Sequence, residues 1–258
     1  MTRTEVVLGG ALLVFAGFIA VQAGKMKRRA PTAAATAPRV TADDSIYTVP
    51  LNLTAAERMR RAAARANLVK LRIADEQGST FIEEVLAQND SVVRRWASSP
   101  RVPVRVWIQQ PLAPADVRPR YVDLVLQALD TWSSAGGVTL RFARIDDSAS
   151  AAVHVVWTMR FPDNRIGLTR IDAVNDTIRT SRITIATQRT DGVPLREGDV
   201  ARCALHEVGH LLGLAHTTDP SSIMAPESAQ PVLSPRDRAT IRLLYALPVG
   251  SIKAGATR

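Results

Sequence analysis

Apolar residues recur at two spacings in the second half of this chain. Residues 102–109 alternate partly between apolar and polar and are rich in β-branched side chains, which predicts a strand. Residues 114–133 carry apolar side chains at helical spacing, namely Val117, Tyr121, Leu124, Val125, Ala128, Leu129 and Trp132. Further strands are predicted at residues 138–145, 151–159, 166–171 and 181–187, so this region has an α+β pattern of about five strands.

The region before residue 96 is predicted to be helical. Thr54 and Glu57 have the spacing of a capping box, ahead of a helix that extends to about Val69. Thr80 and Glu83 repeat this spacing before a second helix through about Gln88. Residues 46–95 fit a short propeptide, a stem, or an extension packed on the following domain.

The N-terminal region contains an uncharged apolar run over residues 6–21. This run has the features of a cleaved signal peptide, and with its neutral flanks to residue 24 it also fits an uncleaved membrane anchor. Basic residues follow it (Lys25, Lys27, Arg28 and Arg29), which by the positive-inside rule favours a cytoplasmic C-terminal side. Residues 30–45 are rich in alanine, threonine and proline, which predicts a linker.

Charge and cysteine content narrow the function classes. The chain of 258 residues has a net charge of +9, but residues 96–247 hold 17 basic and 15 acidic side chains. With dispersed arginines and 5% aromatic residues, we do not expect nucleic-acid binding. The single cysteine, Cys203, excludes an intrachain disulfide, and we expect it to be a small buried residue.

Three of the four histidines lie in one segment, HEVGHLLGLAH, at residues 206–216. On a helix, His206 and His210 share one face and can direct ring nitrogens at one ion. Glu207 then lies beside the metal as a general base, and Gly213 lets the chain turn so that His216 becomes a third ligand. Three protein ligands leave a fourth tetrahedral position to water, which is typical of a catalytic zinc site.

Further motifs give this segment a family resemblance. Met224, in the sequence SSIMAP, resembles the Met-turn of the metzincin proteases. Within the metzincins, residues 233–245 (LSPRDRATIRLLY) and residues 121–142 resemble the last and first helices of the matrixins, the matrix metalloprotease family. The resemblance covers about residues 96–247. It implies a zincin-like α+β fold, in which a mixed, twisted sheet of about five strands packs with an early helix, the active-site helix and a C-terminal helix.

The resemblance also implies an activity. The chain is expected to be a metalloendopeptidase with one zinc ion, acting on protein or peptide substrates outside the cytoplasm, either secreted or anchored through residues 6–24. Ala225 and Pro226 are expected to form a wall of the substrate pocket. No cysteine precedes residue 203, so the cysteine-based latency of many matrixins does not apply. His154 is the only histidine left for a second zinc site, so we expect it to be a packed strand residue. Carboxylates leave calcium sites open (Asp172, Asp176, Asp191 and Asp199), but none is predicted because no acidic loop has the required spacing.

Two alternatives remain open. The first is a non-catalytic zinc-binding interaction module on the same fold, and the second is an interaction protein with a vestigial metal site; Glu207 and the intact ligands argue against both. The domain organisation follows from these segments: a signal or membrane-anchor segment at 1–24, a linker at 25–45, a helical propeptide-like or stem segment at 46–95, the protease domain at 96–247 and a flexible tail at 248–258. The sequence predicts no oligomeric state.

Overall fold

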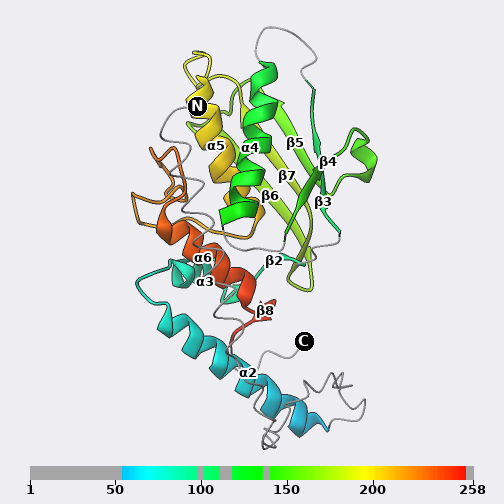
Figure 1. The fold of residues 1–258 in the computed structure, drawn as a ribbon, viewed down its shortest axis with the longest axis vertical. Coiled ribbons are helices and arrows are strands. Elements are labelled where there is room, and N and C mark those ends of the chain that lie inside the picture. The colour runs from blue at the N-terminus through cyan, green and yellow to red at the C-terminus, as the bar shows by residue number, and fades with distance from the viewer. Residues whose placement is uncertain (1–53, 98–101, 111–117, 136–139, 254–258) are drawn as a thin grey trace, which may run out of the picture. The chain divides into compact units, whose positions relative to one another are not determined.

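The structure is a computed structural model that describes residues 54–97, 102–110, 118–135 and 140–253. All of them belong to one folded unit, residues 52–258 (Figure 1). The predicted apolar segment at residues 6–21 and the linker at residues 30–45 lie outside the described residues. Among the described helices, none is both long enough and apolar enough to cross a membrane.

A six-stranded sheet forms one layer of this unit, in agreement with the predicted mixed sheet. Four strands run parallel in the order β4-β3-β5-β7; β2 also pairs in parallel with β7, and β6 pairs with β7 in the antiparallel direction. The strands are β2 (Arg95–Trp96), β3 (Val104–Ile108), β4 (Phe142–Arg144), β5 (Val153–Thr158), β6 (Gly167–Val174) and β7 (Thr177–Ala186). The five predicted strands are confirmed, and the two-residue β2 is an addition.

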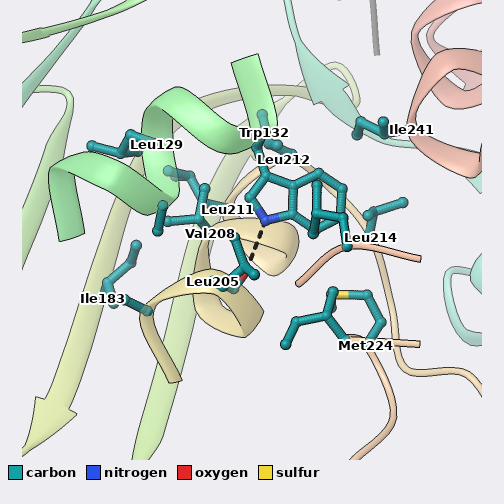
Figure 2. Close-up of a cluster of buried hydrophobic side chains, with 14 of the residues drawn as sticks. Leu129, Trp132, Ile183, Leu205, Val208, Leu211, Leu212, Leu214, Met224 and Ile241 are labelled. Carbon is teal, nitrogen blue, oxygen red and sulfur yellow. Dashed lines mark hydrogen bonds between the residues drawn. The ribbon is translucent and has the colours of Figure 1, made fainter. Parts of the chain in front are cut away.

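Two helices, α4 (Pro119–Ala135) and α5 (Glu197–Leu211), pack together beside the sheet (Figure 1). The described part of the predicted apolar stripe of α4, from Tyr121 to Trp132, is buried. Trp132 is fully buried, and its indole nitrogen donates a 2.7 Å hydrogen bond to the Leu205 carbonyl of α5, as Figure 2 shows. A buried indole needs such a partner for its N–H group, so this bond fixes the register of the two helices.

The N-terminal helices are α2 (Ala55–Asp75) and α3 (Ile82–Gln88). The capping box of Thr54 and Glu57 is confirmed. The one predicted at Thr80 is wrong, because the hydroxyl of Thr80 donates to the Glu76 carbonyl and α3 begins after Phe81.

From Val69 of α2 onward, side chains of the N-terminal region belong to the main core. Phe81, Ile82, Val85 and Trp96 are buried with the side chains of the sheet and of α5. The region also forms a two-stranded sheet, in which β1 (Val92–Val93) pairs with β8 (Gly250–Ser251) after the C-terminal helix α6 (Pro235–Ala246).

Candidate metal centre

Three histidine rings converge at the C-terminal end of α5. His206 and His210 lie one turn apart on α5, and His216 follows in the next loop. The Nε2 atom of His206 lies 3.1 Å from the Nε2 atom of His210 and 3.2 Å from that of His216. The Nε2 atoms of His210 and His216 are 3.2 Å apart. A tetrahedral ion with Zn–N bonds of 2.0–2.1 Å requires its nitrogen ligands to be about 3.3 Å apart. The donor set therefore fits Zn²⁺ in both chemistry and spacing.

The outer ring nitrogens fix the orientation of two of these rings. His206 Nδ1 lies 2.7 Å from the Ile223 carbonyl oxygen, and His210 Nδ1 lies 2.9 Å from the Leu214 carbonyl oxygen. A carbonyl oxygen only accepts hydrogen bonds, so each Nδ1 carries the proton and each Nε2 keeps a lone pair directed at the centre.

Burial keeps these histidines neutral. Desolvation lowers the pKa of His206 and His216, and it lowers the pKa of His210 to about 3. Neutral imidazole is the form that binds a metal, so these histidines are poised as ligands at neutral pH.

Glu207 is buried beside the three rings, with only 5% of its surface exposed. Burial raises the pKa of its carboxyl group to about 7, while a hydrogen bond from Thr169 acts in the opposite direction. The Thr169 hydroxyl on β6 lies 2.6 Å from Glu207 Oε2. A Cβ at Gly167 would come within 2.8 Å of the Glu207 carboxyl carbon, so glycine lets β6 approach this side chain closely.

Met224 lies beneath the helix that carries the ligands. Its side chain is fully buried (Figure 2), and a Cβ at Gly209, between the two helical ligands, would overlap its sulfur atom. The buried carboxylate of Asp237 fixes the turn from α6, because it accepts hydrogen bonds from the Ser222 hydroxyl and, at 3.1 Å, from the Ile223 amide. The predicted Met-turn thus packs against the metal-ligand helix.

Gly213 ends α5 as the sequence predicts. It has a φ of +102°, a conformation that disfavours any side chain, and the chain then turns toward His216.

A cleft of about 1060 Å³ opens over the three histidines and Glu207. Strand β6 contributes Leu168, Thr169 and Ile171 to its lining. Of the two predicted wall residues, Pro226 lines the cleft, whereas Ala225 is buried and is not among the lining residues.

The remaining candidates are not members of the metal group, which among the described residues consists of the three motif histidines. His154 Nε2 lies 2.9 Å from the Ser148 carbonyl oxygen, as expected for a packed strand residue. Cys203 is buried, as predicted, and burial raises the pKa of its thiol.

Comparison with protein families agrees with this geometry. Residues 108–246, more than half of the chain, match the sequence model of the matrixin family of peptidases. The chain belongs to the matrixin family, and its mixed sheet and helices form a metzincin fold.

Proposed function

We propose that this protein is a zinc-dependent endopeptidase. The observation that carries the proposal is the convergence of three neutral histidine nitrogens beside the buried Glu207, at the base of an open cleft. Membership of a peptidase family supports the same reaction.

His206, His210 and His216 would hold the ion, and a fourth position would remain for water. When bound, zinc supplies Lewis acidity that polarises the scissile carbonyl and lowers the pKa of water. Glu207 accepts a proton from the attacking water through its carboxylate, the water oxygen bonds to the carbonyl carbon, and Glu207 passes the proton to the leaving nitrogen as the C–N bond breaks. Burial raises the pKa of this carboxyl group to about 7 in the zinc-free site, a direction that favours proton uptake by Glu207.

Peptide substrates fit the cleft because a strand borders it. On the side away from β7, β6 pairs with no other strand among the described residues. An extended peptide can therefore add to this edge through main-chain hydrogen bonds, with its scissile bond beside Glu207. We place this activity outside the cytoplasm, in keeping with the family.

The test compares the full-length wild type with the Glu207→Ala variant for zinc content and for cleavage of a peptide library. We expect both proteins to bind about one zinc per chain and only the wild type to cut, because the variant keeps all three ligands and loses the base. If both bind zinc and neither cuts, the zinc-binding interaction module becomes the better account. If the wild type binds no zinc, the assignment of the three histidines is wrong.

A further inference from the structure

Helix α3 makes a set of hydrogen bonds to the segment that carries the third histidine. The Glu84 carboxylate accepts from the Thr217 hydroxyl at 2.9 Å, from the Thr218 amide at 2.7 Å and from the Thr218 hydroxyl at 3.3 Å. One turn further on, the Gln88 amide nitrogen donates to the His216 carbonyl oxygen at 2.7 Å. These four bonds join residues that are 128 to 134 positions apart in the sequence, and all of them reach the consecutive residues His216, Thr217 and Thr218.

His216 depends on such contacts more than the other two histidines do. His206 and His210 lie on a regular helix, and each Nδ1 is held by a carbonyl oxygen. His216 lies in a loop, and within the described residues its Nδ1 makes no hydrogen bond to the protein. The loop that carries this ring is therefore held by contacts outside the ring: Gln88 binds the His216 carbonyl oxygen, and Glu84 binds the Thr217 hydroxyl and the Thr218 amide.

The helix that makes these contacts is itself fixed in the core. Phe81, Ile82 and Val85 are at most 1% exposed. The Phe81 amide donates to the Thr240 hydroxyl of α6 at 3.0 Å. A short helix anchored in this way can hold a loop in one position, as a supporting shell does for metal ligands.

We propose that Glu84 and Gln88 are positioning residues for His216, so that α3 is part of the metal centre. This inference rests on the proposed zinc site. Both residues lie before residue 108, where the match to the matrixin family begins. It follows that the catalytic unit includes α3 and does not begin at residue 96, and that removal of residues 46–95 as a propeptide would also remove these contacts.

The experiment measures the zinc dissociation constant of full-length variants by competition with a chelator, together with kcat and KM for a cleaved peptide. Glu84→Ala is expected to weaken zinc binding up to about 10-fold, the low end of the cost of losing a direct partner of a metal ligand, because Glu84 holds the two residues that follow His216. Glu84→Gln should retain part of the affinity because its amide oxygen still accepts a hydrogen bond. Gln88→Ala should weaken binding severalfold, and Glu83→Ala, an exposed carboxylate on the same helix, should stay within twofold of the wild type.

Two further readouts separate positioning from general stability. The unfolding temperatures of the zinc-free proteins show whether the fold is intact, and the visible spectrum of the Co²⁺-substituted proteins reports the ligand geometry, which should change in Glu84→Ala and not in Glu83→Ala. If Glu84→Ala does not fold, Gln88→Ala decides, because its side chain is exposed.

The inference is overturned if the wild type binds zinc and the folded Glu84 and Gln88 variants match its affinity within twofold. A wild type that binds zinc but cuts no peptide contradicts the proposed function and leaves this comparison intact. A wild type that binds no zinc contradicts both.

Discussion

Replacing Gly213 with alanine tests how the chain turns from the ligand helix toward His216. Gly213 has a φ of +102°, and an added Cβ would overlap the Arg94 carbonyl oxygen and lie 3.3 Å from the carbonyl carbon. Because these are backbone atoms of the segment between β1 and β2, they cannot move away by a change of rotamer.

Two terms lower the stability of the Gly213→Ala variant, and one smaller term offsets them. A side chain at positive φ costs about 1–3 kcal/mol. Overpacking against rigid atoms costs about 1–3 kcal/mol. Alanine also lowers the conformational entropy of the unfolded chain, which offsets about 0.4–1 kcal/mol of this loss of stability. We expect the free energy of unfolding to fall by about 3 kcal/mol, which for a domain of this size lowers Tm by about 6–12 °C.

The matched control is Gly198→Ala on α5, where an added Cβ has no neighbour within 4 Å. This control should stabilise the protein by about 0.4–1 kcal/mol, since only the unfolded-state and helix-propensity effects apply. Urea unfolding of the zinc-free proteins, followed by circular dichroism, gives both values without a contribution from metal binding. A Gly213→Ala variant that loses less than about 1 kcal/mol would refute the argument.

Three other predictions concern the centre and its support. Thr169→Val removes the hydroxyl that stabilises ionised Glu207, so the pKa of Glu207 should rise and the acid limb of the pH–activity profile should move to higher pH. An unchanged acid limb would count against this role of Thr169. The zinc-free protein should lose stability as the pH falls below about 6.5. Below this pH His210 takes up a proton in the unfolded chain, whereas in the folded protein it does so only near pH 3, so the falling pH favours the unfolded state. Glu207 has the opposite effect on stability between about pH 4.5 and 7, because it takes up a proton more readily in the folded state than in the unfolded state. The loss of stability should therefore be steeper in the Glu207→Gln variant. A free energy of unfolding that is constant from pH 7 to 5 in that variant would contradict this prediction. Asp237→Ala leaves buried donors unpaired and should cost about 3 kcal/mol or more in urea unfolding, whereas a cost below about 1 kcal/mol would mean that the carboxylate is dispensable.

The features predicted from sequence are those that depend on local spacing. Residues four apart on a helix share a face, so the convergence of His206 and His210 follows from the segment itself. The turn at Gly213 follows from the conformational freedom of glycine. The strands and the buried face of α4 were predicted because their periodicity is also local.

The features that escaped prediction depend on contacts between distant segments. Thr169 meets Glu207 across 38 positions, and Glu84 meets Thr218 across 134, and neither pair has a spacing that a sequence pattern can detect. The predicted cap at Thr80 was wrong for a different, local reason. The Thr80 hydroxyl donates to the Glu76 carbonyl four residues earlier, and α3 begins only after Phe81.

The most direct test of the central claim is a zinc titration of the chelated, full-length protein, with peptide cleavage measured at each addition. We expect no cleavage without zinc, a rise in proportion to added zinc, and a plateau at about one equivalent per chain, because His206, His210 and His216 form a single site. Cleavage that survives complete chelation, or full zinc binding without cleavage at any level, would contradict it.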